Sequence, residues 1–354
     1  MVFLVDQFLP VDYEDSLFHM DIYWKLLRMS RDVAVPHLIF HGPPGSGKKT
    51  LVNVFLRMLY GDSVDNTYTT CYDVPSSGKK VKREIFQSSA HHIAINPTGT
   101  NFDRHLVHEV IKRYATANTI DFVRNPNEKF RVIQISNVDH LSHSAQTSLR
   151  RMIEVNADKC RFIMICHNLN NVIYPLVSRC ICIRVPRPGK SKLFSYVAYK
   201  ASEMKIRPPF AIVDKIVKFS ECNIRVALWY LEMYILGHDI DKKNSYHIMI
   251  DSIVDITSKS DIDDIENIRN IIFNIMMTNY EPTTILRDIV NGFLVMDNIS
   301  DICKINIALH AASVEHDIIR GRRDIIHFDA FIINVMRFLK NDHAQVEKNQ
   351  DTNV

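Results

Sequence analysis

A glycine-rich segment with a lysine carries the clearest chemical signal in this sequence. Gly42 is followed by four residues and then by Gly47 and Lys48. Glycines at this spacing let backbone N–H groups turn onto phosphate oxygens, and the positive end of a following helix adds to the attraction. The pattern predicts a phosphate-binding loop. Its candidate ligands are Gly42, Pro43, Gly45, Ser46, Gly47, Lys48, Lys49 and Thr50.

The segments on either side of this loop agree with that prediction. An apolar run over residues 36–41 precedes it, and residues 51–59 carry apolar side chains at spacings of three and four. Strand, loop and helix in that order are what a phosphate-binding loop requires. A chance glycine-rich turn is the alternative, and it would not need this context.

The loop departs at one position from that of a nucleotide-hydrolysing enzyme. The residue after the loop lysine usually supplies a hydroxyl to Mg²⁺. Here that residue is Lys49, and the nearest hydroxyl, that of Thr50, comes one position later. The sequence therefore leaves a role for Mg²⁺ open, and it shows no other metal-ligand pattern.

A second departure follows the apolar strand expected at residues 130–135. Hydrolysing P-loop ATPases carry an acid for the metal at the end of this strand, and usually a glutamate after it. Ser136 and Asn137 occupy those places, and neither side chain is charged or able to accept a proton. The alternative is that the strand ends later and that Asp139 is the acid.

Composition limits the remaining classes of function. The chain has 354 residues, a formal net charge of +3 and seven cysteines. The small charge indicates that any nucleic-acid contact needs a local basic face. The cysteines lack the spacing of zinc sites and are typical of reduced thiols in an intracellular protein. No apolar run approaches the roughly 20 residues of a membrane-spanning helix, so no membrane contact is expected.

The order of expected elements predicts the fold class. Apolar strands alternate with helices up to residue 185, which favours an α/β protein with a parallel, doubly wound sheet. Pro186, Pro188 and Gly189 mark a boundary. Two all-helical regions follow, separated by a polar stretch at 251–262, and the chain ends in a polar tail. The expected strands cover residues 36–41, 92–95, 130–135, 161–166 and 181–185.

Several segments together resemble one known family. Residues 4–10 look like its N-terminal box, residues 36–50 like its phosphate loop and residues 145–154 like its central helix. Ser178-Arg179-Cys180 matches a motif of the family, and residues 222–225 resemble its second-sensor helix. The chain thus resembles, over nearly its whole length, the small subunits of replication factor C, an AAA+ clamp loader.

Two details are similar to one subunit type within that family. The Lys48-Lys49 pair and the segment 311–331 look like the end subunit of the five-membered arc, whose own site is not catalytic. This is number three in the human naming and number five in budding yeast. Three positions depart from the family pattern: Leu9 replaces an arginine, Ser136-Asn137 is far from an acidic pair, and His167 replaces the first-sensor asparagine unless Asn168 serves.

The resemblance implies a fold and domain limits. They are an AAA+ P-loop domain at 1–188, a helical lid at 189–252, a helical collar for oligomerisation at 253–340 and a polar tail at 341–354. It also implies further nucleotide contacts. These are Val5, Phe8, Pro10, His167, Asn168 and Arg225.

Two more roles follow from the resemblance. Arg179 is expected to act in trans as an arginine finger on a neighbouring ATPase subunit; an arginine that caps a helix or pairs with a local carboxylate is the alternative. Arg104, Lys112 and the start of the helix at 144–154 are the candidates for contacts to the DNA backbone. Ordinary solvated helix faces are the alternative there.

The expected function is therefore that of a clamp-loader subunit that is not itself an enzyme. It would bind ATP or ADP without efficient hydrolysis and help to load the PCNA sliding clamp onto primer–template DNA in replication and repair. Its partners would be the other replication factor C subunits of a heteropentamer, PCNA and DNA. Its place would be the nucleus, or a viral factory or the cytoplasm if the source is a large virus. The alternative is a self-sufficient AAA+ ATPase, such as a helicase-like motor or an initiator.

Overall fold

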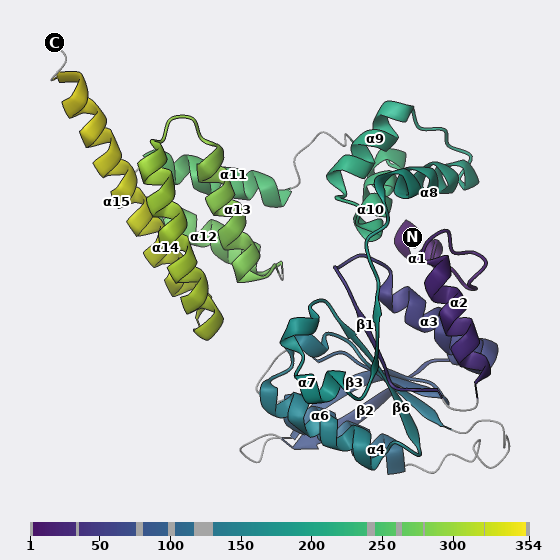
Figure 1. Cartoon of the computed structure of the whole chain (residues 1–354). Coiled ribbons are helices and arrows are strands. Elements are labelled where there is room, and N and C mark those ends of the chain that lie inside the picture. The colour runs from purple at the N-terminus through teal and green to yellow at the C-terminus, as the bar shows by residue number, and fades with distance from the viewer. Residues whose placement is uncertain are drawn as a thin grey trace. The chain divides into compact units, whose positions relative to one another are not determined.

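A computed structural model describes residues 3–32, 35–75, 81–97, 103–116, 130–238, 245–259, 264–278, 280–321 and 323–351. The chain divides into two units, Met1–Ile240 and Asp241–Val354, and each is described by itself. The first unit holds the sheet and the phosphate-binding loop, and the second is helical (Figure 1).

The sheet of the first unit has seven strands in the part of the chain that the structure describes. Their order is β2-β3-β4-β5-β6-β1-β7. Strands β4, β5, β6, β1 and β7 pair in parallel, while β2 pairs antiparallel with β3, and β3 with β4. The strands are β1 (Leu38–His41), β2 (Tyr68–Pro75), β3 (Val81–Ser88), β4 (His92–Ile95), β5 (Arg131–Ile135), β6 (Cys160–Cys166) and β7 (Ile181–Arg184).

This sheet confirms the expected α/β P-loop fold and adds one feature to it. The five parallel strands are those that the apolar runs predicted. The hairpin β2–β3 extends the sheet at one edge in antiparallel sense, so the sheet is mixed. A long polar hairpin does not show the apolar pattern of a buried strand, and for this reason its place in the sheet was not evident from sequence.

Helices cover both faces of the sheet (Figure 1). The side chains along each strand alternate between the cores on the two faces. Leu38 and Phe40 of β1 pack in a core with α2 and α3, whereas Ile39 packs in the core formed with α4, α6 and α7. Because both faces are buried, the strands read as almost continuous apolar runs. The helices are α2 (Met20–Arg31), α3 (Lys48–Tyr60), α4 (Asp103–Thr116), α6 (His143–Val155) and α7 (Tyr174–Val177).

Three helices after the sheet form a smaller core within the same unit. They pack together with the short N-terminal helix α1 (Leu4–Gln7), which contributes the buried side chain of Leu4. Pro209 lies directly before the second of them, where its missing N–H costs nothing. The three are α8 (Lys190–Glu203), α9 (Phe210–Phe219) and α10 (Ile224–Ile235).

Five helices make up the described part of the second unit. Their shared core is rich in isoleucine and phenylalanine. They are α11 (Ser245–Lys259), α12 (Ile265–Met276), α13 (Pro282–Val295), α14 (Asp301–Arg320) and α15 (Asp324–Asp351).

Two expectations about this region were wrong. The stretch at 251–262, expected as a polar connector, is helical through Lys259, because Ile253 and Val254 of α11 face the core of the second unit. The tail expected from residue 341 continues α15 as a helix to Asp351. The expected boundary at 252/253 thus falls inside α11, and the three-part division into sheet, lid and collar domains stays a prediction.

None of the helices in the described ranges has both the length and the hydropathy to cross a bilayer.

Candidate nucleotide-binding site

Three glycines of the loop between β1 and α3 have positive φ, which favours glycine. Gly42 has φ of 151°, Gly45 has φ of 71° and Gly47 has φ of 90°. A Cβ atom on Gly42 would lie 2.1 Å from the carbonyl oxygen of Val185, and one on Gly45 would lie 1.8 Å from Oδ1 of Asn223. The backbone is therefore free to form a cradle, and α3 begins directly after it at Lys48.

Lys48 is buried at the start of α3 and directs its ammonium group at three acceptors. Nζ lies 2.5 Å from the carbonyl oxygen of Gly42, 2.8 Å from that of Pro43 and 3.2 Å from Nδ1 of His167. An ammonium group has three protons, so this geometry uses all of them. Burial lowers the pKa of Lys48 to about 8.

His167 reaches the loop because β6 pairs with β1. Cys166, the last residue of β6, lies opposite His41, the last residue of β1, so the next residue of each strand lies at the same edge. The backbone N–H groups of His167 and Asn168 both donate to Oδ2 of Asp139, at 2.8 and 3.0 Å. Asp139 thus holds the turn that presents His167 to Lys48.

The end of β5 lies where the sequence placed it. The strand ends at Ile135, Ser136 is buried directly after it, and Asn137 donates from Nδ2 to Oδ1 of Asn96 at 3.3 Å. Asp139 lies beyond the strand in the short helix η2 (Val138–His140). Its Oδ1 atom is buried without a hydrogen-bond partner among the described residues, while Oδ2 supports the turn at His167.

A cavity of about 450 Å³ adjoins the phosphate-binding loop. Five of the fourteen predicted nucleotide contacts line this cavity. The other nine do not, and Lys48 and His167 are among them. Val5, another of the nine, packs instead in the core formed with α8, α9 and α10. Sequence reasoning missed the opposite wall, which α8 supplies. The five are Phe8, Pro10, Ser46, Gly47 and Thr50; the missed residues include His19, Tyr23, Tyr196, Tyr199, Lys200 and Ile224.

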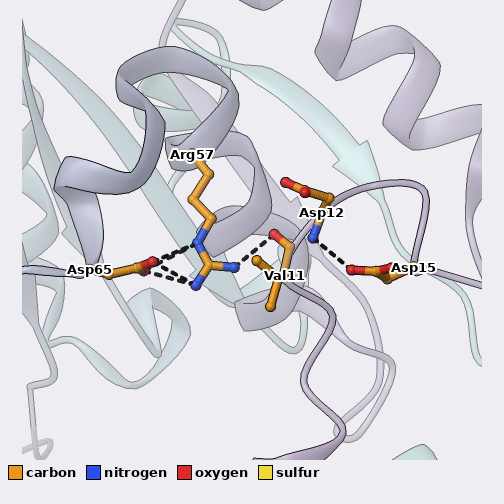
Figure 2. A network of polar contacts seen from close by, with 5 residues as sticks. All are labelled: Val11, Asp12, Asp15, Arg57 and Asp65. Atoms are coloured by element: carbon orange, nitrogen blue, oxygen red, sulfur yellow. Dashed lines mark hydrogen bonds and ion pairs between the residues drawn. The ribbon is translucent and has the colours of Figure 1, made fainter.

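The N-terminal wall of the cavity is tied to α3 by Arg57 (Figure 2). Nη1 of Arg57 donates to the carbonyl oxygen of Val11 at 2.7 Å, while Nε and Nη2 bind both carboxylate oxygens of Asp65 at 2.8 to 3.1 Å. The backbone N–H of Asp12 donates to Oδ2 of Asp15 at 3.2 Å, which closes the turn beside the cavity. These contacts hold the segment between α1 and α2 in place.

Helix α10 begins against the phosphate-binding loop. Asn223 caps it, with Oδ1 accepting from the N–H groups of Arg225 and Val226 at 3.1 and 3.3 Å. The N–H of Ile224 donates to the carbonyl oxygen of Gly45 at 3.2 Å. Arg225, the predicted second-sensor arginine, is exposed in the first turn of this helix.

Arg179 lies after α7, apart from this loop, and is partly exposed. Its Nε donates to Oε1 of Glu154 at 2.7 Å, its Nη2 lies 2.5 Å from the same oxygen, and its Nη1 donates to the carbonyl oxygen of Pro175 at 2.7 Å. In the single chain the arginine therefore has the local carboxylate partner that the sequence offered as the alternative. Exposed ion pairs of this kind contribute about 0–1 kcal/mol, so a stronger anion would displace it.

The structure adds little support for the predicted DNA contacts. Lys112 is exposed on α4, and the side chain of Arg104 lies outside the described residues. The start of α6 is capped by Ser142, whose hydroxyl accepts from the N–H of Ala145 at 3.3 Å. These DNA contacts stay predictions.

The donor set fits a nucleotide better than it fits a metal. A nucleoside phosphate needs a backbone cradle, the start of a helix, a buried lysine and a cavity, and this site has all four. At the end of β5 the side chains of Ser136 and Asn137 offer neutral oxygens. Within the described ranges, no three His, Cys, Asp or Glu side chains gather as ligands for a metal ion.

Comparisons with known proteins agree with these features. A family model described as "DNA polymerase III, delta subunit" matches residues 22–188. The chain is 34% identical over 355 residues to the "Putative replication factor C small subunit L478" of Acanthamoeba polyphaga mimivirus, covering 99% of this chain and 95% of that protein. It is 26% identical to "Replication factor C subunit 3" of Arabidopsis thaliana, covering 95% of this chain and 97% of that one. The Homo sapiens protein of the same name is 25% identical, with 95% and 96% covered.

Among solved structures, the "Thermotoga maritima RuvB Holliday junction branch migration motor" has a TM-score of 0.47 and 14% identity. The match covers 70% of this chain and 80% of that one, and a likeness at this level carries no argument about function. These three relatives match 95–99% of this chain. The chain therefore belongs to the replication factor C small-subunit family of AAA+ clamp loaders.

Proposed function

We propose that this chain is the end subunit of a replication factor C clamp loader, which holds ATP or ADP without efficient hydrolysis. The observation that carries the proposal is the pair Ser136–Asn137 at the end of β5, beside a phosphate-binding loop that keeps its glycines and Lys48. A loop with its lysine retains affinity for phosphate, but without an acidic pair the site lacks a group to hold the metal and polarise water. The nucleotide then acts as a structural ligand.

The contact between the lid and the loop supports this structural role. Ile224 and Asn223 of the lid touch Gly45, and the cavity lies between α8, the N-terminal segment and the loop. A ligand that fills the cavity would bridge these elements and stabilise the unit in proportion to the logarithm of its concentration over its Kd. Arg225, in the first turn of α10, would add a positive charge near the phosphates.

Arg179 is proposed to act on the site of the neighbouring ATPase subunit. Its exposure and its weak partner, Glu154, make it available at the surface of the chain. An arginine that enters a neighbour's site stabilises the charge that develops on the transferred phosphoryl group. The chemistry of this chain would thus take place in another subunit.

The second unit supports assembly with other subunits through α14. One face of this helix is buried in the core of the unit, through Cys303, Ile307, Ala311, Val314 and Ile318. The opposite face is apolar as well, and its large side chains are 59–72% exposed: Ile302, Ile305, Leu309 and Ile319. An exposed apolar stripe of this length is typical of a protein interface. We assign it to contact with the helical regions of neighbouring subunits.

The remaining partners follow from the family. They are the other subunits of a heteropentamer, the PCNA sliding clamp and primer–template DNA, and the place of action would be the nucleus, or a viral factory if the source is a large virus. No residue in the described ranges is assigned to PCNA. Arg104 and Lys112 stay the candidates for DNA.

ATP hydrolysis by the purified single chain tests the proposal against a self-sufficient AAA+ ATPase. We expect turnover at the background of a Lys48→Ala variant, while ADP is recovered from the denatured protein or binds when added. Turnover well above that background, with sensitivity to Lys48→Ala, would show an active site and refute the proposal.

A further inference from the structure

The contact between Lys48 and His167 determines the protonation state of the histidine. Because an ammonium nitrogen has no lone pair, the short contact of 3.2 Å requires Nδ1 of His167 to accept. The imidazole is then neutral, with its proton on Nε2. A protonated ring in the same place would direct an N–H group at a cation.

The groups around His167 come from α3, the phosphate-binding loop and η2. Lys48 of α3 and the loop carbonyl of Gly42 face it on one side, and Asp139 and His140 of η2 face it on the other. The ring of His140 meets it edge-on, with centroids 6.4 Å apart. Burial first, and the charge of Lys48 second, lower the pKa of His167, while Asp139 raises it. Burial, and second to it the lysine that would move onto a phosphate, thus hold the ring in its neutral form.

A bound nucleotide would reverse this balance. Lys48 already uses three acceptors, so it must leave at least one of them to donate to a phosphate oxygen. If it leaves Nδ1 of His167, the ring loses its donor and faces several negative charges. An anion nearby favours the charged form of histidine. Ser136 and Asn137 offer no charge to hold a metal cation that would neutralise the phosphates instead.

We propose that His167 takes up a proton when a nucleoside di- or triphosphate binds, so that its imidazolium supplies positive charge beside the phosphates. The proton comes from solvent and binds to Nδ1; no bond of the nucleotide is broken. This inference rests on the proposed function, since it requires that the loop hold a nucleotide. His167 is then a specificity-determining residue for the charged end of the ligand.

Proton uptake fixes the sign of the pH dependence. Because the complex binds one proton more than the free chain, affinity rises as pH falls, by at most about tenfold for each pH unit between the free and bound pKa values of His167. Lys48 also gains charge stabilisation from a phosphate. With its pKa at about 8 it is largely protonated near neutral pH, so its own uptake belongs to pH 8 and above.

Titration calorimetry of the full chain with ADP in EDTA tests the inference. The titration is run near pH 7 in buffers of different ionisation enthalpy, and the slope of the observed enthalpy against that enthalpy gives the protons taken up. We expect uptake by the wild-type chain and little or none by His167→Asn, whose amide cannot titrate. His167→Gln is a second variant, and His140→Gln is the matched control that should keep the uptake.

The affinities give an independent readout. Between about pH 8 and pH 6, binding of ADP by the wild-type chain should tighten relative to His167→Asn by about tenfold. The ratio cancels the titration of ADP itself, because both proteins meet the same ligand. Equal uptake and parallel pH profiles in the two proteins would overturn this inference and leave the proposed function standing. No binding of ADP by the wild-type chain would overturn both.

Discussion

Nε of Arg179 donates to Oε1 of Glu154 across 2.7 Å, so the arginine that follows α7 is tethered to the last turn of α6. Both side chains are partly exposed, and the pair lies outside the nucleotide cavity of its own chain. Glu154 thus keeps Arg179 extended along the surface between these helices. We interpret the Glu154 carboxylate as the partner that holds Arg179 in the single chain. The phosphates of a nucleotide in the neighbouring subunit would replace it.

Glu154→Gln should therefore cost little. An exposed ion pair contributes about 0.2–1 kcal/mol, so the free energy of unfolding should fall by no more than that amount in denaturant titrations. ATP hydrolysis by a reconstituted assembly should be retained, because the arginine itself is unchanged. A loss of hydrolysis as large as that of Arg179→Ala would show that Glu154 has a part in the reaction.

Gly45→Ala should damage the loop. The new Cβ would lie 1.8 Å from Oδ1 of Asn223 at a φ of 71°, so the Asn223 side chain must leave its place as the cap of α10 and the backbone is strained. We expect a loss of about 1–3 kcal/mol in unfolding free energy and weaker ADP binding. Gly189→Ala is the matched control, since a Cβ there meets nothing within 4 Å. Equal behaviour of the two variants would contradict the described contact.

Arg57→Gln should weaken ADP binding without removing it. The variant loses the hydrogen bond to the carbonyl oxygen of Val11, which holds one wall of the cavity (Figure 2). A reduction of several-fold in affinity is expected by calorimetry. Asp65→Asn keeps Arg57 and its bond to Val11, so its effect should be smaller; the reverse order would argue against this anchoring role.

The lowered pKa of Lys48 predicts that the free energy of unfolding changes with pH above neutrality. Burial lowers its pKa from 10.5 to about 8, so between these values the unfolded chain binds more protons than the folded one. The free energy of unfolding contributed by this group therefore rises with pH over that window. Relative to Lys48→Met, the wild-type chain should gain stability from about pH 8 upward in denaturant titrations. A flat difference between the two would refute the shifted pKa.

The outer face of α14 should matter for assembly and not for folding. Leu309→Glu places a charge on the exposed stripe, so the isolated chain should unfold as the wild type does but co-purify poorly with the other subunits. Ile307→Glu, on the buried face, should destabilise the chain itself. Normal co-purification of the Leu309 variant would remove this face from the interface.

The sequence predicted the parts of this site that depend on local chemistry. Glycine spacing predicted the loop around Gly42, alternating strands and helices predicted the parallel core of the sheet, and the end of β5 falls at Ile135 as expected. These features depend on residues that are neighbours along the chain. Local sterics and hydrophobic periodicity are sufficient for them.

Features that depend on residues far apart in the sequence could not be predicted from local patterns. Tyr196 and Tyr199 line the cavity from a helix about 150 residues after the loop, and no spacing signal connects them to it. The contact of Lys48 with His167 depends on the register of β1 and β6. The helical end of α15 was missed because polarity was taken as a sign of a tail, although Ala, Gln, Glu and Lys are good helix formers.

The most direct test of the account is ATP turnover in a reconstituted assembly in which this chain and the subunit next to it keep their phosphate-loop lysines and every other subunit has lost its own. With Arg179→Ala in this chain, the rate should fall on the order of 10³-fold, as for other arginine fingers, while Lys48→Ala in this chain should leave hydrolysis at the neighbouring site in place. A rate unchanged by Arg179→Ala, or abolished only by Lys48→Ala, would contradict the account.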